Sequence, residues 1–321
     1  MSETRERDNR FSGKRVHVIG LGAYGTGREV ARVLAARGAV VTVSDVKPAA
    51  ELASEIEALR DTQVEILTGD EAYGGIEEAE LVVPSPGVPL DAPPLLRARE
   101  GGADVVSEIE VAFWIAPCPI IAVTGTKGKS TTSALIGEIL KGEGKIVRVG
   151  GNIGRPLIAL ADRATAEELL VAEVSSFQLE ATRSFRPKVG VLLNLFPDHL
   201  DRHRDMAEYR AAKAKLFANQ GPEDAAVINR DDGEAWRLRE STRAEVVPFS
   251  ISEDVAEGAD VSEGWLRVRR RGICRESSVR LRGRHNLSNA LAALAAAGCA
   301  GASLERAADT LAGFEGLEHR L

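Results

Sequence analysis

The sequence of 321 residues has few cysteines and no long apolar run. Its three cysteines, Cys118, Cys274 and Cys299, are odd in number and far apart, which argues against a disulfide framework or a zinc site and indicates reduced thiols in the cytoplasm. The first ten residues are polar and lack the apolar core of a secretory signal. No stretch approaches the roughly 18 apolar residues that cross a bilayer. We therefore expect a cytoplasmic protein that does not engage a membrane.

The sequence also lacks a positive net charge. Its formal net charge is -7, and its basic residues are interleaved with acidic ones rather than clustered. Such a chain has no overall basic field to attract a polyanion, so we expect no nucleic-acid partner. The hydrophobic content of 44% and the charged content of 28% are typical of a globular protein. At about 100 to 200 residues per domain, the length predicts two domains.

Short β-branched runs alternate with longer stretches of helical period, which predicts an α/β fold with mainly parallel sheets. We see two such series and place the boundary near Pro117, so that the domains span residues 1–116 and 117–313. The first series is a strand at 15–19, a helix at 26–37 and a strand at 39–44. The second is a strand at 120–124 with a following helix, buried strands at 168–173, 188–195 and 224–230, an antiparallel excursion at 259–283 and a helix at 286–300.

The first series contains the glycine loop "GLGAYG", from Gly20 to Gly25, between a strand and a helix. This context lets a backbone approach a phosphate at a helix N-terminus. Asp45 ends the next strand, where a dinucleotide fold places its ribose-binding acid. Taken alone, this half is typical of an NAD-dependent dehydrogenase, and a purely structural glycine loop is the alternative.

The second series contains "VTGTKGKSTT", from Val123 to Thr132, again between a strand and a helix. Its backbone N–H groups are expected to cradle phosphates, with Lys129 reaching the outer phosphates and the Ser130 hydroxyl holding Mg²⁺. The spacing is GxxGKS, shorter than the usual GxxxxGK[ST], and an accidental Gly/Lys turn is the alternative. Two nucleotide-type loops disfavour a simple dehydrogenase, because an ATP-driven enzyme with a nucleotide-bearing substrate explains both.

Further motifs resemble the Mur ligases and their folylpolyglutamate synthetase relatives. They are "TGTKGKST", "GNIGRP", "EVSSFQLE", "NLFPDHLDRH", "YRAAKAKLF", "GRHNLSNALAA" and "FEGLEHR", in this order along nearly the whole chain. The resemblance implies a Rossmann-like parallel-sheet domain followed by a P-loop ATPase-like central domain. The pairing of GNIG with SSFQLE is most similar to the member that adds D-glutamate to UDP-N-acetylmuramoyl-L-alanine, and another ligase of the family with a different acceptor is the nearest alternative.

The resemblance implies that the first domain holds the UDP end of the substrate rather than NAD. The substrate-binding residues would then be Gly22, Ala23, Tyr24, Asp45, Ser85, Gly87, Asn152 and His199. Val46 and Lys47 depart from the Thr-Arg pair that this family places after the acid. The departure leaves the uracil contacts and the identity of the nucleotide sugar open.

The resemblance also implies an ATP and Mg²⁺ site in the second domain. The ATP-binding residues would be Gly125, Thr126, Lys127, Gly128, Lys129, Ser130, Thr131, Asn286, Asn289 and Arg320, and the metal ligands Ser130, Glu173, His199 and Lys213. The catalytic residues would be Lys129, Glu173, His199 and Lys213. In similar ligases the lysine at the place of Lys213 is carbamylated, which requires a neutral amine. Structural roles are the alternatives: a strand-end acid for Glu173, a hydrogen-bonded histidine for His199, a solvated helix lysine for Lys213, a helix N-cap for the asparagines and a surface residue for Arg320.

The expected chemistry is the attack of a substrate carboxylate on ATP to give an acyl phosphate, which an amino-acid amine then captures. Residues 314–321 resemble the start of a hinge to a third, amino-acid-binding domain. We therefore expect this chain to be a fragment or one half of a split enzyme, to be monomeric, and to form little peptide bond alone. Two functions from other classes remain open: an NAD-binding oxidoreductase fused to an ATPase, and a non-catalytic nucleotide-sensing module.

Overall fold

The computed structural model describes residues 9–21, 25–199 and 202–316. The chain divides into two compact units. The first contains the chain up to Pro117 together with segments 155–164 and 177–184, and the second contains the remaining residues. The division into domains at 1–116, 117–313 and 314–321 stays a prediction.

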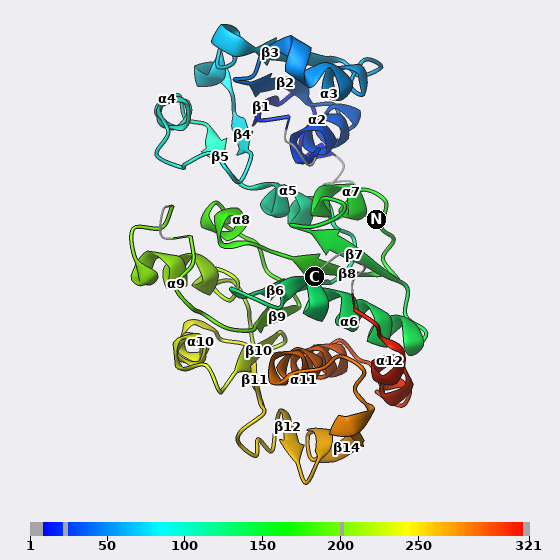
Figure 1. Cartoon of the computed structure of the whole chain (residues 1–321). Coiled ribbons are helices and arrows are strands. Elements are labelled where there is room, and N and C mark those ends of the chain that lie inside the picture. Colours follow the sequence, from blue (N-terminus) through cyan, green and yellow to red (C-terminus); the bar gives the residue numbers. More distant parts are fainter. Residues whose placement is uncertain (1–8, 22–24, 200–201, 317–321) are drawn as a thin grey trace. The chain divides into compact units, whose positions relative to one another are not determined.

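The first unit is built on a five-stranded parallel sheet with the order β3-β2-β1-β4-β5 (Figure 1). Its strands are β1 (Arg15–Ile19), β2 (Val40–Asp45), β3 (Val64–Thr68), β4 (Leu81–Pro84) and β5 (Asp104–Val105). Its helices are α2 (Thr26–Ala36), α3 (Ala53–Glu57), α4 (Pro93–Glu100), α5 (Glu108–Ile115) and α7 (Leu157–Ala161), with 3₁₀ turns η1 (Ala49–Leu52), η2 (Gly69–Glu71) and η3 (Ile76–Glu78).

Helix α2 forms because apolar residues recur at helical spacing and face the sheet. Val30, Ala31, Val33 and Leu34 are all buried, while the remaining face carries charged side chains. The strand β1 is central in the sheet, so the loop between β1 and α2 opens at the carboxyl edge, next to the ends of β2 and β4. In a parallel sheet this edge is where ligands bind.

The second unit is built on a nine-stranded sheet with the order β14-β13-β12-β11-β10-β9-β6-β8-β7 (Figure 1). Its strands are β6 (Ile120–Thr124), β7 (Val147–Gly151), β8 (Leu169–Glu173), β9 (Val189–Leu192), β10 (Ala225–Asn229), β11 (Glu245–Ser250), β12 (Ala259–Ser262), β13 (Trp265–Val268) and β14 (Arg271–Arg275). The strands from β7 to β12 pair in parallel, whereas β12, β13 and β14 pair antiparallel.

The helices of the second unit are α6 (Lys129–Gly142), α9 (Met206–Ala214), α10 (Gly233–Arg237), α11 (Arg284–Cys299) and α12 (Ala307–Gly313), with 3₁₀ turns η4 (Leu238–Ser241) and η5 (Glu276–Ser278). Helix α8 (Ser176–Glu180) begins in this unit and continues into the first. The alanine-rich α11 packs against α6 and the strands β9 to β13. Its residues 290–297 are all buried in the core of the unit, because alanine lets helix and sheet approach closely.

The α/β class, the strands at 15–19 and 120–124, the acid at the end of β2 and the antiparallel excursion are confirmed. The helix expected at 286–300 begins two residues earlier, at Arg284, with Gly283 as its N-cap. The alternative reading of Asn286 or Asn289 as the N-cap is therefore wrong. Among the described helices, none combines the length and apolarity that a bilayer crossing needs.

Candidate functional site

The loop from Gly125 to Gly128 joins β6 to α6 at the carboxyl edge of the large sheet. Gly128 is the N-cap of α6 and has φ 87°, in the left-handed region. A Cβ atom there would lie 2.4 Å from Asn289 Oδ1, so only glycine fits. The first amides of the 14-residue α6 thereby point into the loop without a capping side chain. This is the geometry that binds a phosphate.

Two side chains that follow Gly128 are held by the loop and its neighbouring strand. Lys129 Nζ donates to the carbonyl oxygens of Gly125 and Thr126, both at 3.0 Å, and so folds back over the loop. Ser130 Oγ donates to Glu173 Oε2 at 2.6 Å. Glu173 ends β8 beside β6 and is 1% exposed. A buried carboxylate thus lies within hydrogen-bond distance of the serine hydroxyl of the phosphate loop.

Asn152 completes the surroundings of this carboxylate. Its Nδ2 donates to Glu173 Oε1 at 3.1 Å, and its backbone N–H donates to the Glu173 carbonyl at 2.8 Å. A serine hydroxyl and a carboxylate are oxygen ligands of the kind that Mg²⁺ prefers, usually with waters and substrate phosphates in its other positions. Within the described residues no group of three His, Cys, Asp or Glu side chains gathers to form a metal cage. The donor set therefore fits Mg²⁺ held jointly with a phosphate.

Lys213, on α9, is buried next to the same loop. Its Nζ donates to Thr124 Oγ1 at 3.1 Å and to the Gly125 carbonyl at 3.2 Å. The pKa of this amine is lowered to about 7, mainly by burial and then by the positive charge of Lys129, while Asp198 and Glu173 act in the opposite direction. A substantial neutral fraction of the amine is therefore present near pH 7. The alternative interpretation of Lys213 as a solvated helix lysine is therefore wrong.

His199 lies in the loop after β9 and adopts φ 54°. Its side chain is half exposed, and Nε2 is 3.9 Å from Asp198 Oδ2. The same carboxylate oxygen lies 3.9 Å from Lys127 Nζ. Asp198 thus links His199 to the phosphate loop by charge. A positive φ at a non-glycine residue is uncommon and is a frequent feature of functional sites.

The remaining predicted ATP residues of this unit lie around α6 and α11. Thr126 Oγ1 is hydrogen-bonded to Tyr209 Oη at 3.1 Å and accepts from Phe196 N at 3.1 Å. Thr131 lies in the first turn of α6. Asn289 reaches Gly128 and donates to Asn286 Oδ1 at 3.3 Å, and Asn286 Nδ2 donates to the Arg282 carbonyl at 2.8 Å. Arg320 lies outside the described residues.

Sequence reasoning missed two residues that contact this loop, Asn194 and Tyr209. The Asn194 carboxamide accepts from Lys127 N–H at 2.9 Å and donates to the Lys127 carbonyl at 3.0 Å, so it holds one loop residue from both sides. Buried Tyr209 lies between Thr126 and Lys213, whose Nζ is 4.8 Å from the centre of its ring. Both residues lie inside segments that carried the family resemblance, "NLFPDHLDRH" and "YRAAKAKLF". Their place in these motifs is the signal by which they could have been found.

The first unit has its own loop site at the end of β1. Asp45 Oδ2 accepts from Leu21 N–H and Oδ1 from Lys47 N–H, both at 3.0 Å. Ser85 N–H donates to the Ile19 carbonyl at 2.7 Å, which places the segment with Gly87 beside the loop. Gly22, Ala23 and Tyr24 lie outside the described residues. The structure therefore brings Asp45 and Ser85 to the loop at the carboxyl edge of β1.

Glycine at position 27 explains how α2 starts so close to this loop. A Cβ atom on Gly27 would lie 1.8 Å from the Gly20 carbonyl oxygen, well inside contact distance. The sequence prediction did not single out Gly27, although it lies two residues after the loop, in the first turn of the helix. Its missing side chain is what allows the helix N-terminus to approach the strand end.

Two families of known domains match the chain. The Mur ligase middle domain matches residues 123–297, and the Mur ligase MurD-like N-terminal domain matches residues 14–107. Among curated proteins, the UDP-N-acetylmuramoylalanine--D-glutamate ligase of Pelotomaculum thermopropionicum is 47% identical over 315 residues, which cover 97% of this chain and 69% of that protein. The protein of the same name from Caldanaerobacter subterraneus subsp. tengcongensis is 41% identical, covering 96% and 68%.

Solved structures share the fold at lower identity. The UDP-N-acetylmuramate:L-alanyl-gamma-D-glutamyl-meso-diaminopimelate ligase from Neisseria meningitides aligns with a TM-score of 0.65 and 20% identity, covering 96% of this chain and 100% of that one. UDP-N-acetylmuramate-alanine ligase from Thermotoga maritima aligns with a TM-score of 0.59 and 22% identity, covering 95% and 69%. These alignments support the two-part α/β architecture.

Proposed function

This chain belongs to the Mur ligase family, and on that basis we propose that it joins D-glutamate to UDP-N-acetylmuramoyl-L-alanine in an ATP-dependent step of peptidoglycan precursor synthesis. The observation that carries the proposal is the convergence of Lys129, Ser130, Glu173 and Lys213 on one phosphate loop. A purely structural glycine loop has no need for two lysines and a buried carboxylate in that arrangement.

In the proposed reaction a carboxylate oxygen of the L-alanyl group attacks the γ-phosphorus of ATP. A new P–O bond forms, the bond to the ADP oxygen breaks, and an acyl phosphate results. The amine of D-glutamate then attacks the acyl carbon, inorganic phosphate leaves, and the nitrogen loses a proton as the amide forms. Lys129 contributes positive charge at the outer phosphates, where negative charge is transferred during the first step.

We assign Ser130 and Glu173 to a Mg²⁺ ion at the phosphates, and Glu173, His199 and Lys213 to a second one. Bound Mg²⁺ would supply charge neutralisation at the phosphate oxygens. Asn152 supports this role by fixing one oxygen of Glu173 and leaving the other to face Ser130. The same asparagine is our candidate for contact with the reacting end of the substrate.

We further propose that Lys213 is carbamylated. The neutral amine attacks CO₂, a C–N bond forms, and a proton leaves, which turns a cation into an anionic oxygen ligand. Its pKa of about 7 supports this step, because the unprotonated amine is the form that reacts. Mass spectrometry under non-denaturing conditions in bicarbonate is expected to show the added carboxyl mass, which Lys213→Met would lack.

The nucleotide ends of the two substrates are assigned to different units. We place the uridine diphosphate at Asp45, Ser85 and Gly87 together with residues 22–24. We place the adenine of ATP near Asn286 and Asn289, and Arg320 near the ATP. Support for the first assignment is the meeting of the β1 loop with the ends of β2 and β4. Support for the second is the contact of Asn289 with Gly128.

Calorimetric titration of the chain with UDP-N-acetylmuramoyl-L-alanine and, separately, with NAD tests the proposal. We expect saturable binding of the sugar nucleotide and none of NAD. Hydroxylamine trapping with ATP and the sugar nucleotide should then yield a hydroxamate derived from the acyl phosphate. Binding of NAD instead of the sugar nucleotide would identify an oxidoreductase, and acyl phosphate captured by another amino acid in preference to D-glutamate would identify a ligase with a different acceptor.

A further inference from the structure

Two motifs that carried the family resemblance meet at a buried hydrogen bond between residues that the proposed reaction does not use. His203 ends the motif "NLFPDHLDRH", and Ser176 lies in "EVSSFQLE". The His203 ring nitrogen Nε2 lies 2.9 Å from the Ser176 hydroxyl oxygen, within hydrogen-bond distance. The two residues are 0% and 2% exposed. They are 27 residues apart in the sequence, so it is the fold of the second unit that brings them together.

His203 is also attached to His199 through the backbone. Its N–H donates to the His199 carbonyl at 2.9 Å, and the Arg202 N–H donates to the same oxygen at 3.0 Å. His199 has φ 54°, an uncommon backbone conformation for a residue with a side chain. The two hydrogen bonds help to fix that conformation. The place of His199 therefore depends on where His203 is held.

Ser176 connects this histidine to the end of β8. It begins α8 and follows Glu173 by three residues. The backbone of Glu173 is fixed in the sheet, because it pairs with Val123 of β6. The hydrogen bond between His203 and Ser176 thus joins the segment of His199 to the strand end that carries Glu173.

The other face of the contact is the ring of Tyr209 on α9. The two ring centres are 5.0 Å apart and the rings are tilted by 52°, an arrangement that aromatic pairs prefer. Tyr209 in turn contacts Thr126 of the phosphate loop and lies next to Lys213. The neighbours of the His203 imidazole therefore lead to all three residues that we assign to the second Mg²⁺.

We propose that His203 is a positioning residue for the second Mg²⁺, an inference that rests on the proposed function. Its imidazole, held by Ser176 and Tyr209, fixes His199 relative to the end of β8. His203 acts through these neighbours and is not a ligand itself, because its Nε2 is engaged by Ser176 in a buried contact. Residues that hold metal ligands in place typically change metal affinity by about 10- to 100-fold when they are replaced.

The test uses Mn²⁺ in place of Mg²⁺, because both ions suit octahedral oxygen-rich sites and the EPR signal of free Mn²⁺ allows the bound ions to be counted. The purified chain is titrated with Mn²⁺ in the presence of one equivalent of AMP-PNP, a non-hydrolysable ATP analogue. We expect the wild type to bind two ions. His203→Phe keeps a ring beside Tyr209 and removes the hydrogen bond to Ser176. It should weaken the second ion about tenfold or more and change the Kd of the first by less than about twofold.

Two further variants test the hydrogen bond from both of its ends. The side-chain amide of His203→Gln reaches about as far as Nε2 and can donate to Ser176, so the Kd of the second ion should return to within about threefold of the wild type. Ser176→Ala should weaken the second ion about as much as His203→Phe. The double variant should weaken it no more than either change alone, because both remove the same contact.

His17 provides a matched control in the first unit. Its Nε2 lies 2.8 Å from the Ser44 hydroxyl oxygen, and the two residues are 2% and 0% exposed. His17→Phe therefore removes a buried histidine–serine pair of the same kind, and thermal unfolding compares its general cost with that of His203→Phe. We expect His17→Phe to bind both Mn²⁺ ions as the wild type does.

Equal binding of the second ion by the wild type and His203→Phe would overturn the proposal. Equal weakening of both ions, or a loss of the second ion in His17→Phe as large as in His203→Phe, would also overturn it and indicate general destabilisation. If His203→Phe does not fold, Ser176→Ala and His203→Gln decide the question. A wild type that binds fewer than two ions would reject the second Mg²⁺ and this inference with it, whereas hydroxylamine trapping tests the ligase reaction separately.

Discussion

The two glycine loops share a backbone plan and differ in their surroundings. Each follows a strand inside a parallel sheet and precedes a helix. At the first loop, both oxygens of Asp45 are occupied by backbone N–H groups of Leu21 and Lys47. At the second, Glu173 accepts from the side chains of Ser130 and Asn152, and two lysines donate to the loop carbonyls.

This difference distinguishes a loop that can only bind a phosphate from a loop at which a phosphate can also react. In both loops, glycines precede the start of a helix, which is an arrangement that can bind an anion. Among the described residues, the second loop has two lysines and a buried carboxylate around that position, and one of the lysines, Lys213, has a pKa of about 7. We therefore expect reactive chemistry at the second loop, and we propose that the first loop binds the substrate.

The largest effect should come from Lys129→Ala, which alters only the second loop. Loss of its charge at the outer phosphates should reduce acyl-phosphate formation about a thousandfold or more, as for other removed charge-stabilising donors. Binding of UDP-N-acetylmuramoyl-L-alanine, measured by calorimetry, should remain nearly unchanged. Normal turnover in this variant would contradict the assignment of the reactive chemistry to the second loop.

Lys127→Ala is the matched control for that experiment. Lys127 lies two residues earlier, its side chain is 77% exposed, and its contacts with Asn194 involve only the backbone. We expect a much smaller loss, because among the described residues the Lys127 ammonium pairs only with Asp198, at 3.9 Å. A loss equal to that of Lys129→Ala would indicate that general positive charge, and not the position of Lys129, supports the reaction.

The next effect concerns Lys213 and pH. Its folded pKa of about 7 lies below the unfolded value of 10.5, so between these values the unfolded chain binds a proton that the folded chain does not. The Lys213 contribution to the free energy of unfolding should therefore rise with pH through this window, by a few kcal/mol at most, roughly 1.4 per pKa unit. Below pH 7 the buried amine is charged in the folded chain, so its full destabilising effect on folding is present.

Denaturant unfolding of the wild type and Lys213→Met from pH 7 to 10.5 measures this contribution as the difference between the two proteins. CO₂-free buffer is needed, because a carbamate would change the titrating group. Parallel curves over the whole window would show that the amine is not buried as described. They would also remove one support for its carbamylation.

The smallest effect should come from Gly27→Ala, which alters only the first loop. The added Cβ meets the Gly20 carbonyl oxygen at 1.8 Å, so the helix must move, at a cost of about 1 to 3 kcal/mol. Sugar-nucleotide binding should weaken while ATP binding is retained, as measured by separate titrations. Gly74→Ala, whose Cβ would meet ordinary contacts at 3.4 Å or beyond, should leave both unchanged.

The strands and the main helices could be predicted because their signals are local. Apolar runs ended by glycine, glutamate or asparagine predicted β1, β6, β8 and β10 to within about a residue. The resemblance named Glu173 and Lys213 although they are 40 residues apart. No local rule connects them, since it is the order of β8, β6 and β9 in the sheet that brings them to one loop.

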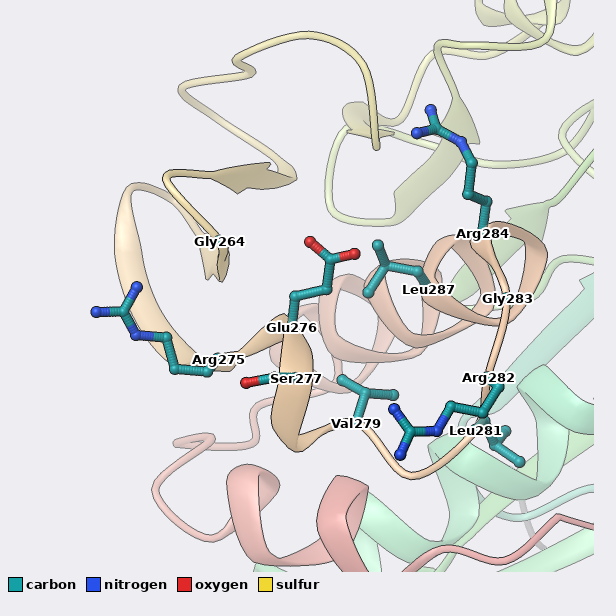
Figure 2. A pocket seen from close by; sticks show the side chains of 10 residues that line it. All are labelled: Gly264, Arg275, Glu276, Ser277, Val279, Leu281, Arg282, Gly283, Arg284 and Leu287. Atoms are coloured by element: carbon teal, nitrogen blue, oxygen red, sulfur yellow. The ribbon is translucent and has the colours of Figure 1, made fainter.

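The features that the sequence did not predict depend on contacts between segments that are distant in the sequence. The pairing of Asn194 with Lys127 requires β9 to lie beside β6, and the gap filled by Gly27 depends on the angle at which α2 leaves the loop. The start of α11 was misjudged because Arg284 and His285 have no apolar signal. The pocket lined by Val279, Leu281 and Leu287 (Figure 2) combines residues before and within α11, and no local sequence pattern indicates it.

Strand β14 forms one border of the nine-stranded sheet, so one side of its backbone has no partner strand within the described chain. Such a border invites pairing with the same strand of another molecule, the route by which sheets grow into fibres. Arg271 and Arg275 at its two ends, with Arg269 and Arg270 in the preceding turn, would bring like charges together in that pairing. We therefore expect these four arginines to disfavour edge-to-edge pairing and aggregation through β14.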